Sequence, residues 1–175
     1  MRYRRANVEG GTYFFTVNLA DRHRSLLVDH VDVLREVLHY VKERHPFRMD
    51  ALVVLPDHLH TIWTLPKGDR DFPTRWMLIK TGFSRRVTAD ERRSDSRRQK
   101  GERGIWQRRY WEHLIRDDED YRRHVDYVHY NPVKHGHVAR AAEWPHSTFS
   151  QYVNQGVYSP DWGEGDDSGS FGERQ

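Results

Sequence analysis

Hydrophobic residues follow two different periods along this chain, and the two periods alternate. Within Thr12–Leu19 the residues Tyr13, Phe15, Val17 and Leu19 fall on one side, which is the two-residue period of a strand. Between Val33 and Val41 apolar residues recur every three or four positions, which is the period of a helix with one buried face. Over the whole chain these periods predict strands at Thr12–Leu19, Phe47–Leu55, His58–Leu65 and Tyr110–Ile115, and helices from after Asp29 to Arg44, from Asp71 to about Val87, and from Asp117 to between Pro132 and Gly136.

Capping and turn residues define several of these boundaries. We expect Asp29 to cap the first helix, because its carboxylate can accept hydrogen bonds from the free N–H groups of the first turn. That helix should end near Arg44, because a proline such as Pro46 disfavours helical geometry in the residue before it. Pro56 and Asp57 are typical turn residues, so the second and third strands should form an antiparallel hairpin.

The order of elements predicts the fold class. The first six elements read strand, helix, strand, strand, helix, strand. This is the ferredoxin-like βαββαβ pattern, an α/β (α+β) sandwich whose four-stranded antiparallel sheet carries two helices on one face. The third helix is additional and is free to pack beside the sheet. We expect one domain over residues 1–159 with a mobile charged loop at 88–103, followed by an acidic, disordered tail at 160–175.

The composition narrows the class of protein. A chain of 175 residues with 36% hydrophobic residues is long enough for one core. It has no cysteine, which excludes disulfides, thiolate metal sites and cysteine nucleophiles. No apolar stretch has the length of a membrane helix, and no signal-peptide core follows the basic start of the chain. We therefore expect a cytoplasmic protein that does not bind membranes and that is nucleoid-associated when it binds DNA.

The charge of the chain is unevenly distributed. Its formal net charge is +3, but residues 161–175 have a net charge of −4, so residues 1–160 carry +7. Aromatic residues make up 13% of the chain. A basic body that is rich in arginine and aromatic residues favours a nucleic acid as the partner.

Two residue pairs carry the candidate chemistry. His58 and His60 flank Leu59 in the third predicted strand, and alternate residues of a strand share a face, so both imidazoles should project together. Tyr127 and Asn131 are four residues apart in the last predicted helix and should also share a face. Each pair alone is more often structural than functional. Their joint presence in a basic chain favours a metal-assisted tyrosine nucleophile that acts on a phosphodiester.

The metal in this hypothesis is Mg²⁺ or Mn²⁺, bound by His58, His60 and Asn131. A phenol with a pKa of about 10 is a weak nucleophile at neutral pH. A divalent ion beside it can polarise the phosphate and offset the charge of the transition state, and Mn²⁺ accepts imidazole as well as oxygen ligands. The alternative is a structural zinc site, which without cysteine would need two further histidines or carboxylates.

Three segments resemble a known family. They are Leu55–Pro66, Ile105–His113 and Val125–Gly136. Together they resemble the REP-associated tyrosine transposases, which belong to the single-tyrosine HUH nucleases, and the likeness extends in order from Met1 to about Trp162. The resemblance implies a ferredoxin-like fold, a divalent-metal-dependent nuclease of single-stranded DNA, and recognition of repetitive extragenic palindromes that fold as hairpins.

The resemblance also implies a role for each candidate residue. By their position in the motifs, His58 and His60 are metal ligands, Tyr127 is the nucleophile and Asn131 is the polar helper one turn later. The family further implies that the tyrosine forms a 5′-phosphotyrosine link and leaves a free 3′-hydroxyl. The charged segment 88–103 and the acidic tail match no motif of the family.

Basic and aromatic residues near these motifs are the expected DNA contacts, since cations bind phosphates and rings stack on unpaired bases. They are Arg2, Arg4, Arg5, Lys80, Arg85, Arg86, Arg108, Arg109, Trp111 and Lys134. Two other functions remain open: a non-catalytic module of the same fold that binds single strands, and a metal-dependent phosphodiesterase that uses activated water. We expect a monomer rather than a homodimer.

Overall fold

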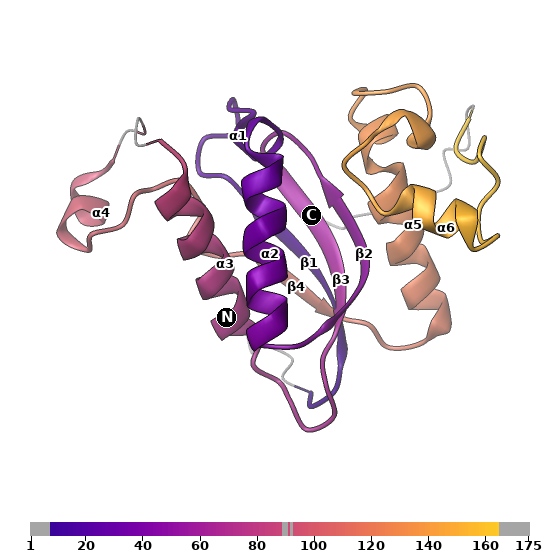
Figure 1. Cartoon of the computed structure of the whole chain (residues 1–175), viewed down its shortest axis with the longest axis horizontal. Helices are drawn as coiled ribbons and strands as arrows, with labels where there is room; N and C mark the ends of the chain where they lie inside the picture. Colours follow the sequence, from indigo (N-terminus) through magenta and orange to yellow (C-terminus); the bar gives the residue numbers. More distant parts are fainter. Residues whose placement is uncertain (1–7, 89–90, 92, 165–175) are drawn as a thin grey trace, which may run out of the picture.

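The computed structural model describes residues 8–88, 91 and 93–164, and Figure 1 shows their arrangement. Its strands are β1 (Thr12–Asn18), β2 (Arg48–Val54), β3 (His58–Thr64) and β4 (Trp111–Leu114). Its helices are α1 (Leu26–Asp29), α2 (Val31–Arg44), α3 (Phe72–Arg86), α4 (Asp95–Gln99), α5 (Asp118–Lys134), the 3₁₀ helix η1 (Ala141–Glu143) and α6 (Phe149–Asn154). All seven predicted elements are present, and α1, α4, η1 and α6 are additions to them.

The four strands form one antiparallel sheet in the order β2-β3-β1-β4. This order, with α2 between β1 and β2 and α3 between β3 and β4, is the ferredoxin-like arrangement, so the predicted fold is confirmed. Helices α2 and α3 cover one face of the sheet, and α5 lies against the other face together with η1 and α6 (Figure 1).

Both faces of the sheet are buried, each in its own cluster of side chains. Toward α2 and α3, the indole rings of Trp63 on β3 and Trp76 on α3 stack with their centroids 4.3 Å apart. Toward α5, Phe14 of β1 and Ile62 of β3 belong to a second cluster with Val128 of α5. Consequently, polar side chains that β3 directs toward α5 are shielded from water. They therefore need hydrogen-bond partners within the protein.

The two edges of the sheet differ. The main chain beyond η1 pairs with the outer edge of β2: Val54 N–H donates to the His146 carbonyl at 2.8 Å, and Thr148 N–H donates to the Leu52 carbonyl at 2.9 Å. Strand β4 is only four residues long, and in the described part of the chain it pairs with β1 alone.

The prediction that Asp29 caps the first long helix is wrong. Asp29 is the last residue of α1, and its carboxylate accepts a hydrogen bond from Ser25 Oγ at 2.6 Å. Helix α2 begins after His30, which has no side-chain capping bond. The cause is the extra helical turn Leu26–Asp29, which buries Leu26 and Leu27 and includes Asp29 as its last residue, so that His30 precedes α2.

Helix α5 continues through Pro132 rather than ending there. Asp117 caps its start by accepting the Asp120 N–H at 2.8 Å. Pro132 lacks an N–H and therefore forgoes one bond of the helix, but the helix extends to Lys134. It then closes at Gly136, which has a φ of 71° and donates its N–H to the Val133 carbonyl at 2.9 Å.

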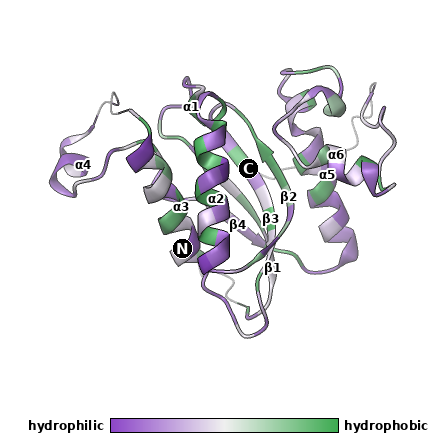
Figure 2. Ribbon diagram, in the orientation of Figure 1, coloured by the Kyte–Doolittle hydropathy of each residue, from purple (hydrophilic) through white to green (hydrophobic). Residues whose placement is uncertain are grey.

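Two segments that we expected to be irregular are partly ordered by contacts. The segment 88–103 includes α4, which is largely hydrophilic in Figure 2, and Arg103 beyond it donates to the carbonyl of Val87 at 2.8 Å. In the expected tail, the indole of Trp162 packs on the ring of Tyr158 with centroids 4.4 Å apart. Residues 165–175 lie outside the described part of the chain. No helix among the described residues is long and apolar enough to cross a membrane.

Candidate active site between the sheet and helix α5

His58 and His60 project from β3 toward α5, as the alternation of the strand predicts. Leu59 between them faces the opposite cluster of side chains. The two imidazole rings lie with centroids 4.9 Å apart. In the sheet, His60 pairs with Thr16 and His58 pairs with Asn18 on β1. The hairpin register therefore brings polar residues of β1 next to both histidines.

One ring nitrogen of each histidine is held by a neighbour. His60 Nδ1 lies 2.8 Å from Thr16 Oγ1, and His58 Nδ1 lies 2.7 Å from Asp57 Oδ1. The other oxygen of Asp57 accepts a hydrogen bond from Arg22 Nε. These contacts fix both rings and leave Nε2 of each as the available nitrogen. A ring held at Nδ1 with a free Nε2 is the usual arrangement of a metal-binding histidine.

Burial keeps both histidines neutral. It lowers the pKa of His60 well below the ordinary value, and nearby positive charges act in the same direction. It also lowers the pKa of His58, although the hydrogen bond to Asp57 opposes this shift. A neutral imidazole can donate a lone pair to a metal ion, whereas a protonated one cannot.

Tyr127 and Asn131 face this pair from α5. The Tyr127 ring lies 5.1 Å from the His60 ring between centroids, and Lys134 Nζ lies 4.8 Å from the centroid of the Tyr127 ring. Asn131 is fully buried. The predicted grouping of two histidines, a tyrosine and an asparagine is therefore a cluster in space, formed where α5 crosses β3.

Unpaired polar atoms in this cluster suit a bound cation. His60 Nε2 and both amide atoms of Asn131 are buried and complete no hydrogen bond with any described residue. A buried polar atom without a partner typically costs about 1–3 kcal/mol. A divalent ion bound by His58, His60 and the Asn131 oxygen would provide the missing partner, so these residues fit Mg²⁺ or Mn²⁺.

Sequence reasoning missed the residues that hold and extend this cluster. Thr16 and Asp57 orient the rings, but no periodic signal connects Thr16 to a histidine 44 residues later. His135 also lies here, with its ring 5.2 Å from that of His58. The helical spacing of four that links Tyr127 to Asn131 leads next to His135, so this residue could have been found.

Two of the expected DNA contacts lie near the cluster. Trp111 of β4 pairs with Thr16, which pairs with His60 on its other side, so all three share one face of the sheet. Trp111 is 53% exposed. Lys134, two turns beyond Tyr127 on α5, is also exposed. Both residues could therefore contact a strand that reaches Tyr127.

Three other expected contacts lie on α3, which covers the opposite face of the sheet. They are Lys80, Arg85 and Arg86. Lys80 Nζ donates to the Gln107 carbonyl at 2.6 Å, and burial lowers its pKa to about 8. Arg86 forms an ion pair with Glu36 at 3.3 Å. Lys80 thus connects α3 to the segment before β4.

The remaining expected contacts are divided between the surface and the undescribed start of the chain. Arg109 is exposed, and Arg108 pairs with Glu102 at 2.9 Å. Arg2, Arg4 and Arg5 lie outside the described residues.

Comparison with known proteins finds relatives that are similar over nearly the whole chain. No family model matches it. The REP-associated tyrosine transposase of Escherichia coli K12 is 46% identical over 172 residues, which cover 98% of this chain and 96% of that protein. The chain belongs to the REP-associated tyrosine transposase family. A second relative, from Haemophilus influenzae Rd, is 45% identical over 162 residues, which cover 92% of each chain.

A solved structure of the family agrees with the fold. It is described as a REP-associated tyrosine transposase bound to a REP hairpin, and it superimposes on this chain with a TM-score of 0.82 at 46% identity. The alignment covers 100% of this chain and 98% of that one. The resemblance inferred from three segments is thus confirmed over the full length of the chain.

Proposed function

We propose that this protein is a transposase that cleaves single-stranded DNA beside a REP hairpin, with Tyr127 as the nucleophile and a divalent ion bound next to it. The observation that carries the proposal is the buried Nε2 of His60 and the buried amide of Asn131, which complete no hydrogen bond with the described residues. The ring of Tyr127 lies 5.1 Å from that of His60 between centroids. Membership of the family supplies the substrate class, because a relative has been solved with a REP hairpin bound.

His58, His60 and Asn131 would hold Mg²⁺ or Mn²⁺. The ion, when bound, would polarise the scissile phosphate and offset the negative charge that builds on it. Asp57 accepts a hydrogen bond from Nδ1 of His58 and so favours the tautomer whose Nε2 is free for ligation, and Thr16 holds the ring of His60 in position. Because the ring positions are fixed before DNA arrives, little reorganisation is needed when the phosphate binds.

Tyr127 would form the covalent bond. Its phenolic oxygen attacks the phosphorus, the bond to the 3′-oxygen breaks, and the leaving oxygen takes up a proton as a free 3′-hydroxyl. The product is a 5′-phosphotyrosine link, which keeps the energy of the phosphodiester for a later rejoining. The ammonium of Lys134, 4.8 Å from the centroid of the Tyr127 ring, would place a positive charge beside the phosphate under attack.

The DNA partner follows from the surroundings of Tyr127. The exposed ring of Trp111 offers a stacking surface for an unpaired base, and Lys134 offers a cation for phosphate. We propose a single-stranded flank across this region and a hairpin bound by the basic body, with the protein acting as a monomer on DNA in the cytoplasm.

A covalent-adduct assay tests the proposal. The protein is incubated with Mn²⁺ and an oligonucleotide hairpin that carries a labelled single-stranded flank, and adducts are separated on a denaturing gel. Tyr127→Phe should abolish the adduct and leave hairpin binding nearly unchanged, since only a hydroxyl is lost. Tyr130→Phe is the matched control, because Tyr130 lies on the same helix but contacts Trp162.

The assay also separates the other two functions. A binding module would retain the hairpin but never form an adduct. A hydrolase with activated water would release cleaved strands without an adduct. An adduct that maps to Tyr121 or Tyr130 by mass spectrometry would exclude Tyr127 as the nucleophile.

A further inference from the structure

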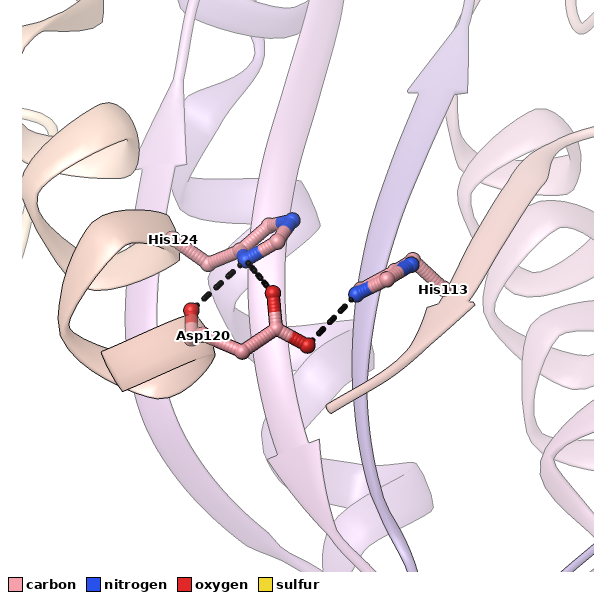
Figure 3. A group of neighbouring side chains, drawn as sticks. All are labelled: His113, Asp120 and His124. Carbon is pink, nitrogen blue, oxygen red and sulfur yellow. Dashed lines mark hydrogen bonds and ion pairs between the residues drawn. The ribbon is translucent and has the colours of Figure 1, made fainter. Parts of the chain in front are cut away.

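A second group of metal-ligating side chains lies on the same face of the sheet as the candidate active site. It consists of His113 on β4 and of Asp120 and His124 on α5 (Figure 3). The ligand atoms of the three residues all lie within 4.8 Å of one another, and within the described ranges no other set of three histidines or carboxylates meets this condition.

The three side chains converge on one carboxylate. His113 Nε2 lies 2.8 Å from Asp120 Oδ2, and His124 Nδ1 lies 3.2 Å from Asp120 Oδ1 (Figure 3). In a tetrahedral zinc site, bonds of about 2.0–2.1 Å place neighbouring ligand atoms about 3.3 Å apart. The observed separations are therefore close to those of a bound site. Since His124 Nδ1 carries the proton that it donates to the Asp120 carbonyl, the ion would bind when the ring turns its lone-pair nitrogen, Nε2, toward the carboxylate.

The hydrogen bonds of the group leave part of it unsatisfied. His124 Nδ1 donates to the main-chain carbonyl of Asp120 at 2.8 Å. Asp120 Oδ1 is buried and completes no hydrogen bond with the described residues. A buried carboxylate oxygen without a hydrogen bond is unfavourable, and the guanidinium of Arg116 pairs with the other oxygen of this carboxylate, Oδ2, at 3.4 Å. Asp120 Oδ1 is therefore a candidate metal ligand because, like His60 Nε2, it is buried and completes no hydrogen bond with the described residues.

Charge and access are also suitable for a cation. The side chains of His113 and His124 are 27% and 21% exposed, whereas that of Asp120 is 3% exposed. An ion can thus reach the group from solvent and meet a buried carboxylate. Burial acts to raise the pKa of Asp120, but hydrogen bonds from His113 and from the Arg116 N–H outweigh it and lower the pKa to about 2.

We propose that His113, Asp120 and His124 form a second metal site, which binds Zn²⁺ or a similar transition-metal ion with water as the fourth ligand. Two imidazoles and one carboxylate match the ligand preferences of Zn²⁺ rather than those of Mg²⁺. The site is separate from the His58–His60 pair, because the ring of Phe14 lies 4.8 Å from that of His124 and 5.5 Å from that of His60, between centroids.

Such an ion would fix the position of the nucleophile. It would connect β4 to the first half of α5, and Tyr127 lies three residues after His124, on the same side of the helix. The same three side chains without an ion would connect these elements by hydrogen bonds alone, and the experiment must distinguish these two arrangements.

Metal binding is best measured in the full chain with the candidate active site disabled. The background variant is His58→Ala/His60→Ala, stripped with EDTA. We expect it to bind one Zn²⁺ per chain in calorimetry, to show the visible absorption of tetrahedral Co²⁺, and to unfold at a higher temperature when Zn²⁺ is added. Because DNA cleavage is not the readout, a negative result would leave the proposed role of Tyr127 untouched.

Three further variants in this background identify the ligands. His113→Gln and His124→Gln should each weaken Zn²⁺ binding by more than the roughly 10–100-fold loss that is typical of residues outside the ligand shell. His39→Gln is the control, since His39 is 75% exposed on α2 and pairs only with Glu43. Circular dichroism verifies folding, and the two ligands are changed separately so that a folding defect in one leaves the other informative. The proposal is overturned if the background variant binds neither ion, or if both ligand variants bind Zn²⁺ as tightly as the control.

Discussion

Replacement of Thr16 by valine tests whether the hydrogen bond to His60 prepares a metal site. Valine has the shape of threonine and suits a strand, so the change removes the hydroxyl and little else. Thr16 is 8% exposed and His60 is 2% exposed, so water cannot readily replace the lost partner. His60 Nδ1 would then be a second unpaired nitrogen on a ring whose Nε2 already completes no hydrogen bond.

The expected effects have two parts. An unpaired buried nitrogen should lower the free energy of unfolding by about 1–3 kcal/mol. A metal-binding histidine that loses its orienting partner should bind the ion about 10–100-fold more weakly, which corresponds to about 1.4–2.7 kcal/mol. The second effect should shift the Mn²⁺ concentration for half-maximal adduct formation and the calorimetric Mn²⁺ affinity by the same factor.

The same pair of strands provides the matched control. Thr12 Oγ1 lies 2.8 Å from Thr64 Oγ1, on the same face of the sheet but at the other end of β1 and β3. Thr12→Val should affect stability without changing the dependence on Mn²⁺. If both valine variants shift that dependence equally, the Thr16 hydroxyl does not orient a metal ligand, and our interpretation of the His60 environment is incorrect.

Three further predictions concern neighbouring residues. Asn131→Leu should weaken Mn²⁺ binding while raising the free energy of unfolding of the metal-free protein by about 1–3 kcal/mol, because the amide it removes is buried and unpaired. Chemical denaturation in the presence of EDTA measures the free energy of unfolding, and a decrease would contradict the prediction. Trp111→Ala should weaken binding of the single-stranded flank by about 1–3 kcal/mol and leave the Mn²⁺ affinity unchanged. If the wild type and the variant each bind a hairpin with a flank as tightly as a hairpin without one, Trp111 does not stack on the flank. Burial lowers the pKa of His129 to about 3, so below about pH 6.5 the unfolded chain binds a proton at this residue and the folded chain does not. The free energy of unfolding should therefore be highest above about pH 6.5 and fall by about 1.4 kcal/mol per pH unit as the pH drops toward 4. His129→Gln should show a shallower decline in denaturation curves across this range.

The parts of the site that follow a period could be predicted from the sequence. Alternation along β3 places His58 and His60 on one face, and helical spacing on α5 places Tyr127 beside Asn131. These are local relations, in which one element determines the direction of both side chains. The same local reasoning gave the order of elements and hence the fold.

The parts that depend on how elements meet could not be predicted. Thr16 reaches His60 only through the register of β1 with β3, and His113 reaches Asp120 only because β4 lies beside α5. Lys80 is a predicted DNA contact because it is a cation near the motifs, and only the packing of α3 shows that it also donates to the Gln107 carbonyl.

The unequal edges of the sheet limit how copies of this protein can associate. Residues 146–148 occupy hydrogen-bonding groups of Leu52 and Val54 in the second half of β2, so a strand of another molecule cannot add along the whole of this edge. Strand β4 offers only four residues, and the bulky, exposed Trp111 is one of them. Association by strand addition, the commonest route by which open sheets aggregate, is therefore disfavoured at both ends. Any assembly of this protein on DNA should instead be held together by side chains or by the DNA itself.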